Sequence, residues 1–183
     1  MRDPRLATID DVAAISKLID ASVRGLGAGY YDDVQIEASL RHLFGVDTQL
    51  IRDGTYYVIE REGEIVAAGG WSARRTLFGG DQYKSATDTP LDPATEPARI
   101  RAFYVHPGYA RQGLGSQLFR CCASAAHSAG FRRLELVSTL PGQPLYRALG
   151  FTALEPVEVT LPGEVAMNCH RMSRPLTDAD SAE

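Results

Sequence analysis

The segment from Phe103 to Ser116 reads Phe-Tyr-Val-His-Pro-Gly-Tyr-Ala-Arg-Gln-Gly-Leu-Gly-Ser, and it decides the fold. An extended run ends at Pro107-Gly108, and apolar spacing predicts a helix from Gly113 to Gly130. Amides at a helix start have no intrahelical acceptor and carry the positive end of the helix dipole. Glycines let an anion approach such amides closely, so the segment is typical of a phosphate or pyrophosphate cradle, to which Arg111 would add charge.

Two competing phosphate motifs fail on spacing. Gly108 to Gly113 matches the first half of a nucleotide-hydrolysing P-loop, but Leu114-Gly115 stands where lysine and a hydroxyl residue are required. A dinucleotide fingerprint needs glycine or alanine at position 118, which is Leu118. A bare Gly-x-Gly is also compatible with a glycine turn that merely starts a buried helix.

The rest of the chain alternates helix-like and strand-like segments. Helices are predicted near 12–19, 35–44, 113–130 and 145–149, and strands near 5–7, 56–60, 65–68, 99–105, 134–137, 153–161 and 164–172. This order predicts an α/β (α+β) fold with a mixed sheet rather than a regular βαβ alternation. Gly69-Gly70 is expected to end the strand at 65–68. Residues 79–97 are rich in Gly, Asp, Thr and Pro and are predicted to form a long surface loop that is either mobile or functional.

Composition narrows the class of protein. The chain has 183 residues, 44% hydrophobic and 23% charged, which suits one folded domain rather than a disordered chain. A net charge of −4 disfavours a nucleic-acid partner and gives no attraction to an anionic membrane. Apolar stretches are too short to span a bilayer, and no apolar signal core follows Met1. Three cysteines and four histidines show no metal-ligand spacing, so we expect a soluble, cytoplasmic, metal-free protein.

Two motifs in the same order and spacing carry a family resemblance. Ala110 to Gly115 is similar to the pattern [Gln/Arg]-x-x-Gly-x-[Gly/Ala], with both glycines present and Ala110 departing from the expected Gln or Arg. Leu145 to Phe151 reads Leu-Tyr-Arg-Ala-Leu-Gly-Phe and resembles the [Phe/Leu]-Tyr-x-x-x-Gly-Phe ending of the same family. Over residues 5–174 the chain resembles the GCN5-related N-acetyltransferase (GNAT) superfamily. The resemblance implies a single domain at 1–174, a flexible tail at 175–183, and a mixed, mostly antiparallel sheet flanked by helices, with splayed parallel strands at the cofactor site.

The resemblance implies acetyl-CoA as the acetyl donor. The strand before the loop would offer backbone groups to the pantetheine arm, and the loop amides would hold the pyrophosphate. The family often places an asparagine seven residues before its tyrosine, and Thr139 stands there in this chain. The implied donor-binding residues are Phe103, Tyr104, Val105, Arg111, Gln112, Gly113, Leu114, Gly115, Ser116 and Thr139.

The implied reaction is direct acetyl transfer to a primary amine of a small molecule or protein. Tyr146 occupies the position of the family's general acid, which would protonate the leaving sulfur, although a buried core tyrosine is the alternative. Many relatives place a glutamate base four residues before the position matched by Phe103, and this chain has Arg99 there. Glu96 lies nearby, and a water molecule is a further candidate base. Arg99 also leaves open a non-catalytic acyl-CoA-binding sensor or interaction module.

Acceptor contacts are predicted from position in the family fold. They are Tyr30, Tyr31, Trp71, Arg99 and Arg101. Arginines in the acceptor groove would bind a carboxylate or phosphate, while surface salt bridging is the alternative for these arginines and for Arg74-Arg75. The loop at 79–97 would then be a lid over the same groove. We expect an amine-bearing small molecule or protein as partner, no nucleic acid and no membrane, and a monomer or homodimer.

Overall fold

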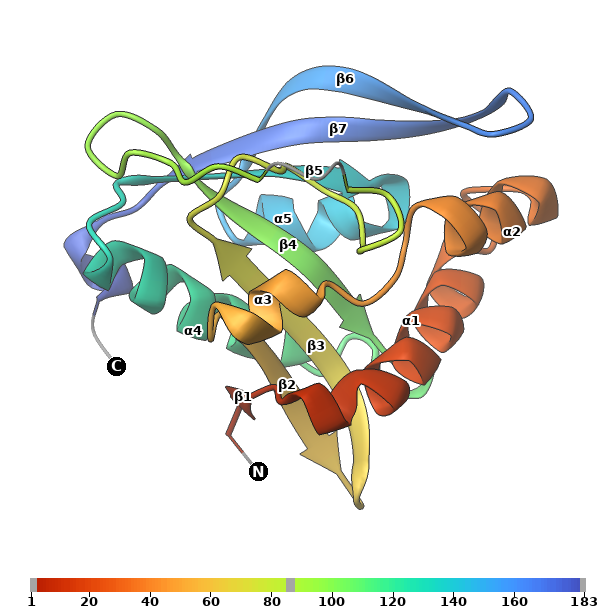
Figure 1. The fold of residues 1–183 in the computed structure, drawn as a ribbon, viewed down its shortest axis with the longest axis horizontal. Coiled ribbons are helices and arrows are strands. Elements are labelled where there is room, and N and C mark those ends of the chain that lie inside the picture. The colour runs from red at the N-terminus through yellow and green to blue at the C-terminus, as the bar shows by residue number, and fades with distance from the viewer. Residues whose placement is uncertain (1–2, 85–87, 182–183) are drawn as a thin grey trace.

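The computed structural model describes residues 3–84 and 88–181, which form a seven-stranded sheet with helices on both faces (Figure 1). The strand order is β1-β2-β3-β4-β5-β7-β6. The strands are β1 (Arg5–Leu6), β2 (Tyr56–Arg61), β3 (Glu64–Ser72), β4 (Ala98–Val105), β5 (Arg133–Thr139), β6 (Thr152–Leu161) and β7 (Val165–Pro175). The helices are α1 (Val12–Gly27), α2 (Asp33–His42), α3 (Thr48–Arg52), α4 (Leu114–Ser128) and α5 (Gln143–Ala148), with short 3₁₀ turns at 9–11, 107–109, 140–142 and 178–180.

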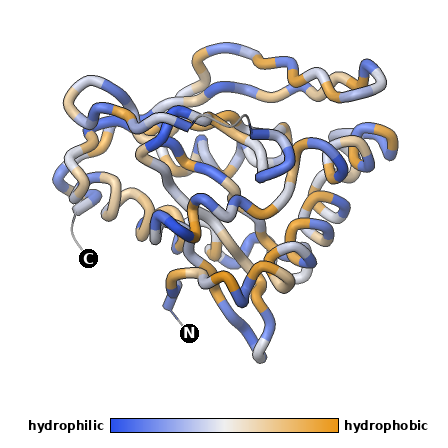
Figure 2. Tube along the Cα trace, viewed as in Figure 1, coloured by the Kyte–Doolittle hydropathy of each residue, from blue (hydrophilic) through white to orange (hydrophobic). Residues whose placement is uncertain are grey.

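Helices α1, α2 and α3 lie in front of the sheet in Figure 1, and α4 and α5 lie behind it. The front helices bury one face each, as Ile15, Leu18 and Ile19 of α1 show. In Figure 2, hydrophobic and hydrophilic positions alternate along α1 and α2, as expected of amphipathic helices packed on a sheet. Behind the sheet, Phe119 and Cys122 of α4 are buried in a core shared with β3, β4 and β5. None of the helices in the described part of the chain has the length and apolarity needed to cross a membrane.

The only parallel contact among the seven strands, within the described residues, joins β4 to β5. It consists of two register pairs, Ala98 with Leu134 and Arg99 with Glu135. Beyond Arg99 the two strands separate, although β4 continues to Val105 and β5 to Thr139. All other strand pairs are antiparallel. The predicted mixed sheet with splayed parallel strands is confirmed.

Three local features differ from the sequence-based expectations. Helix α3 was not predicted, because five residues are too few to show helical periodicity. Gly69 and Gly70 lie inside β3 rather than at its end: a Cβ on Gly69 would lie 2.7 Å from the Phe103 ring, so the glycine makes room for that ring. At the C-terminus, β7 runs to Pro175 and the side chain of Leu176 is buried, so the packed fold extends two residues past the predicted boundary at 174.

Candidate functional site

The predicted phosphate cradle lies at the start of α4, beside the gap between β4 and β5. Gly113 is the N-cap of α4 with φ 82°, a left-handed conformation, and Arg111 is also left-handed with φ 63°. The first backbone hydrogen bond of this helix runs from Gln117 N to Gly113 O, at 3.0 Å. The amides of Leu114 to Ser116 therefore have no acceptor within the helix and are free to bind an anion.

The two glycines of the cradle are needed for different reasons. A Cβ at Gly113 would meet no atom beyond its chain neighbours within 4 Å, so the space there is open, and the positive φ favours glycine. At Gly115 a Cβ would lie 2.8 Å from Leu145 Cδ2 of α5. Gly113 thus shapes the loop, while Gly115 allows α4 to pack closely against the helix that carries Tyr146.

Strand β4 contains a bulge where it leaves β5. The register with β3 shifts between Ala68 and Gly70, and Ala102 on β4 has a positive φ of 54°. After the bulge, Phe103 packs with the α4 side of the core, and Tyr104 packs toward α1. The amide of Val105 donates to Ser22 Oγ at 3.3 Å, so this amide is already engaged within the protein. Phe103 and Tyr104 remain the better candidates for backbone contacts to a pantetheine arm.

Tyr146 lies on α5 behind the open part of the gap. Its ring centroid is 6.3 Å from that of Phe103 and 5.6 Å from that of Phe151. The residue is 9% exposed, and its hydroxyl makes no hydrogen bond to any part of the chain that the structure describes. Burial raises the pKa of Tyr146 above its usual value, so the phenol keeps its proton at neutral pH. A buried phenol without a protein partner is available to a bound molecule.

Thr139 and Tyr31 meet at the end of β5. Thr139 is the last residue of β5 and precedes the 3₁₀ turn at 140–142. The Tyr31 hydroxyl accepts from the Leu140 amide at 2.9 Å and donates to the Asn168 carbonyl at 2.7 Å. Tyr31 thereby ties the loop between α1 and α2 to β5 and β7, and the single hydrogen of its hydroxyl is already donated within the protein. Its neighbour Tyr30 is 53% exposed and remains a candidate acceptor contact.

The structure does not bring Trp71 to the acceptor side of the sheet. Trp71 pairs in register with Ile100, and both side chains are buried in the core behind the sheet. Its ring packs edge-on against Phe131, with centroids 6.1 Å apart. Because side chains alternate along a strand, the neighbours of Ile100 on β4, Arg99 and Arg101, point to the opposite face.

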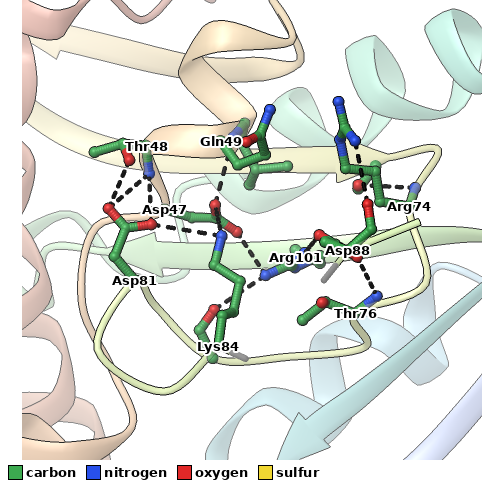
Figure 3. Close-up of polar contacts among 12 residues, drawn as sticks. Asp47, Thr48, Gln49, Arg74, Thr76, Asp81, Lys84, Asp88 and Arg101 are labelled. Carbon is green, nitrogen blue, oxygen red and sulfur yellow. Dashed lines mark hydrogen bonds and ion pairs between the residues drawn. The ribbon is translucent and has the colours of Figure 1, made fainter. Parts of the chain in front are cut away.

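Arg101 does lie on the front face, but its side chain is part of a buried ion cluster (Figure 3). Its Nη2 lies 2.6 Å from Asp47 Oδ2 and 3.1 Å from the Gly79 carbonyl, and its Nη1 lies 3.7 Å from Asp88 Oδ2. Lys84 binds the other oxygen of Asp47. The side chains of Arg101 and Asp47 are 1% and 0% exposed, so Arg101 is not available to an acceptor.

The same cluster fastens the segment predicted to be a lid. Asp81 accepts from the Thr48 amide and hydroxyl at the start of α3, and the Asp88 carboxylate accepts from the Thr76 amide (Figure 3). Backbone bonds from Gly80 to Leu43 and from Asp81 to Val46 add to these. Residues 79–84 are thus held against the start of α3, and residues 88–91 are held against residues 73–76 and Arg101 of β4, while 85–87 lie outside the described residues.

The surface arginines next to this segment are paired with carboxylates. Arg74 contacts Asp53 at 2.7 Å, and Arg75 binds Glu96. Glu96 also accepts from the Asp92 amide at 2.8 Å, and these bonds hold the pKa of its carboxyl below the usual value. A carboxylate with a lowered pKa is a weaker proton acceptor, which disfavours Glu96 as the base.

Arg99 and Glu135 form the closed end of the gap. Arg99 Nη1 lies 3.4 Å from Glu135 Oε2, and the other oxygen of Glu135 accepts from Arg171 Nε. The side chains of Arg99 and Glu135 are 12% and 6% exposed. Burial lowers the pKa of Arg99 from its ordinary value. With an arginine in the base position, the described residues of this site offer no unpaired carboxylate as a base.

Two residues important at this site were missed from the sequence. Glu135 sits between Leu134 and Leu136, and strand alternation alone would have placed it on the face opposite to these buried leucines. Asp47 directly precedes Thr48, a pattern typical of a helix N-cap, but its partner Arg101 is far away in the sequence. No group of three or more potential metal ligands occurs among the described residues.

With this geometry established, comparison with known proteins identifies the family. A family model described as the acetyltransferase (GNAT) family matches residues 16–151. Because the match spans well over half of the sequence, the chain belongs to the acetyltransferase (GNAT) family. The comparison with curated proteins found no match.

Solved structures with the same fold include three that cover nearly the whole chain. A GCN5-related N-acetyltransferase from Rhodopseudomonas palustris has a TM-score of 0.71 at 17% identity, covering 96% of this chain and 98% of that one. The paiA N-acetyltransferase from Thermoplasma acidophilum, solved with coenzyme A, has a TM-score of 0.63 at 13% identity, covering 96% and 99%. The yncA protein from Salmonella typhimurium, solved with acetyl-CoA, has a TM-score of 0.62 at 18% identity, covering 95% and 93%. At these identities the likeness concerns the fold.

Proposed function

We propose that the protein is an N-acetyltransferase that moves the acetyl group of acetyl-CoA directly to a primary amine. The single observation that carries this proposal is the splayed gap between β4 and β5, with the open amides of α4 at one end and the unpartnered Tyr146 hydroxyl beside it. Membership of the acetyltransferase family and the coenzyme A found with two structures of the same fold support acetyl-CoA as the donor.

The residues present fit this donor. The amides of Leu114 to Ser116 and the charge of Arg111 would bind the pyrophosphate, and the open space at Gly113 lets it approach the backbone. The edge of β4 at Phe103 and Tyr104 has lost its β5 neighbour, so its backbone is free to pair with the amide-containing pantetheine arm. When bound, acetyl-CoA supplies an acetyl group activated as a thioester.

Tyr146 would assist departure of the sulfur. As the amine nitrogen bonds to the acetyl carbon, the carbon–sulfur bond breaks and negative charge collects on sulfur. The Tyr146 phenol keeps its proton because burial raises its pKa, so it donates a hydrogen bond and then the proton to the sulfur. The amine must lose a proton as well, and water is the base that this site favours, because Glu135 and Glu96 are both engaged by arginines.

The test is acetyl transfer to a broad amine panel, followed by release of free thiol, with the Tyr146→Phe variant beside the wild type. Loss of a general acid lowers kcat by about 10²- to 10⁴-fold, and we expect a loss in this range with unchanged acetyl-CoA affinity. Because the hydroxyl makes no hydrogen bond to the described residues, the variant should keep the wild-type melting temperature.

Tyr31→Phe is the matched control for stability, since it removes a hydroxyl that has two protein partners. It should lower the melting temperature, which Tyr146→Phe should leave unchanged. Tight acetyl-CoA binding without thiol release for any amine would contradict the enzyme and favour the acyl-CoA-binding sensor instead.

A further inference from the structure

Arg99 stands at the point where β4 and β5 separate. It forms the last register pair of the parallel contact, with Glu135. Its side chain points to the front face, because its neighbour Ile100 is buried in the core behind the sheet. Phe119 and Phe151 belong to the buried core behind the sheet, on the face opposite to Arg99, so an acceptor that approaches the gap from the front face would meet Arg99.

The guanidinium of Arg99 lacks hydrogen-bond partners. Its Nε and Nη1 are buried and make no hydrogen bond, and the closest carboxylate oxygen, on Glu135, lies 3.4 Å from Nη1. Glu135 accepts a hydrogen bond from Arg171 instead. Buried donors are nearly always paired in folded proteins, and leaving them unpaired is costly. The side chain keeps 12% of its surface exposed, so the guanidinium is enclosed but not sealed.

Other arginines nearby have a carboxylate oxygen closer to the guanidinium than Arg99 has. Arg74 makes two hydrogen bonds to Asp53 and a third to the Asp88 carbonyl. Arg101 has two carboxylates, those of Asp47 and Asp88, and the Gly79 carbonyl around its terminal nitrogens, although its Nε makes no hydrogen bond to any described residue.

Arg99, by contrast, has to share its carboxylate. Glu135 is hydrogen-bonded to Arg171, which also contacts the exposed Glu155 at 3.0 Å. Arg171 thus has two carboxylates within hydrogen-bond distance, whereas Arg99 has only the more distant oxygen of one. The positive charge of Arg99 is therefore the least compensated in this group of four side chains.

We propose that the acceptor carries a carboxylate and that Arg99 binds it. This inference rests on the proposed acetyl transfer and names the acceptor class of the same site. A planar guanidinium offers parallel donors that match a carboxylate, and one partly compensated positive charge suits one carboxylate. Glu135, on the other side of Arg99, holds the guanidinium in place and would repel the larger charge of a phosphate.

The position of Arg99 also limits the shape of the acceptor. Arg99 precedes Phe103 by four residues on β4, a separation of about 13 Å at ~3.3 Å per residue, shortened by the bulge. The Arg99 side chain bridges part of this length. Acceptors with several carbon atoms between amine and carboxylate therefore fit better than glycine, which has one.

The test compares amino acids with their amides in the thiol-release assay. The pairs are glycine and glycinamide, 4-aminobutanoate and its amide, and 6-aminohexanoate and its amide. Phosphoethanolamine is added as an amine that carries a phosphate instead of a carboxylate. We expect the wild type to prefer the better carboxylates over their amides by about 10- to 100-fold in kcat/KM, mainly through KM, as one charge-assisted pair provides. Arg99→Gln should remove this preference by lowering kcat/KM for the acids toward the values of their amides.

Arg171→Gln is the matched control, because it also removes a cationic partner of Glu135 but lies one strand further from β4. A purely structural role for Arg99 predicts that both variants slow acids and amides alike. Arg99→Lys keeps the charge without the fork and should restore part of the preference. Equal wild-type rates for acids and amides, or a preference for phosphoethanolamine, would overturn this inference and leave the transferase intact. Failure with every amine despite acetyl-CoA binding would overturn both.

Discussion

Replacing Arg101 with methionine should destabilise the protein strongly although the residue lies far from the donor cradle. The substitution keeps a long, flexible side chain in place but removes the charge that faces Asp47 and Asp88 (Figure 3). Asp47 is 0% exposed, so water cannot take over the role of the lost guanidinium. The variant also loses the bond to the Gly79 carbonyl, which fastens the loop between β3 and β4.

The size of the effect follows from the burial of the pair. Breaking a buried ion pair by removing one partner costs about 3–5 kcal/mol, because an uncompensated charge stays in the interior. Lys84 remains on Asp47, which places the expected loss near the lower end, at about 3 kcal/mol. For a domain of this size the loss corresponds to a decrease in Tm of about 6–12 °C.

Urea unfolding of the wild type and the variant, followed by circular dichroism, measures this loss directly. Arg24→Met is the matched control, since Arg24 pairs with Glu37 at the surface with 45% and 62% of the two side chains exposed, and it should cost far less stability than Arg101→Met. Native-state proteolysis should cut the segment 79–97 faster in Arg101→Met than in the control. Equal, small losses for both variants would show that the ion cluster does not hold the loop.

Three further substitutions test the cradle, the tyrosine bridge and a surface ion pair. Gly113→Glu should abolish acetyl-CoA binding in calorimetry. Gly163→Glu is the control: Gly163 lies in a hairpin turn with the same φ of 82° and the same open space, so this variant should bear the same backbone strain and bind acetyl-CoA normally. Equal affinities of the two variants would show that the cradle is not at Gly113. Tyr31→Phe should lower the free energy of unfolding by about 1–3 kcal/mol in urea, because two backbone partners lose their bond, and a neutral result would refute the bridge. The Arg5 guanidinium lowers the pKa of Asp11 to about 2, so the stabilisation that this carboxylate gives the folded state is complete above about pH 4 and is lost as pH falls toward 2. The difference in unfolding free energy between wild type and Asp11→Asn should therefore shrink over that range, and a constant difference would contradict the pairing.

Local patterns predicted most of the elements to within a few residues. The predicted helix at 113–130 is α4 at Leu114–Ser128, and the predicted strand at 153–161 is β6 at Thr152–Leu161. The spacing of apolar residues and the position of glycines in turns were enough to predict these elements, because both depend on the backbone and on neighbouring side chains. Helix α3 was not predicted because five residues are too few to show a helical period. The predicted end of β3 was wrong because its two glycines make room for neighbouring side chains and do not end the strand.

For the candidate site too, features defined by the local sequence were predicted and features that depend on distant segments were not. The proposed cradle at Gly113 and the proposed acid Tyr146 were identified from motifs, and their roles stay predictions, but the helices that carry them are where the local sequence put them. Trp71 was expected at the acceptor side, but the register of β3 against β4 sends it behind the sheet. Arg101 was expected there too, and a buried partner from another segment removed it from the solvent.

The sequence by itself indicated the family, the order of most elements and the helix start that we propose as the donor cradle, because helix starts, turns and left-handed glycines depend on residues close together in the chain. Only the tertiary structure decided which of the two front-facing arginines of β4 is surrounded by carboxylates. Arg99 and Arg101 share a strand and a face, and they differ solely in what distant segments bring to them. Asp47 and Lys84 come from the front of the sheet to occupy Arg101, whereas Glu135 reaches Arg99 already bound to Arg171. Charge pairing between segments far apart in the chain depends on strand order and burial, which no local pattern encodes.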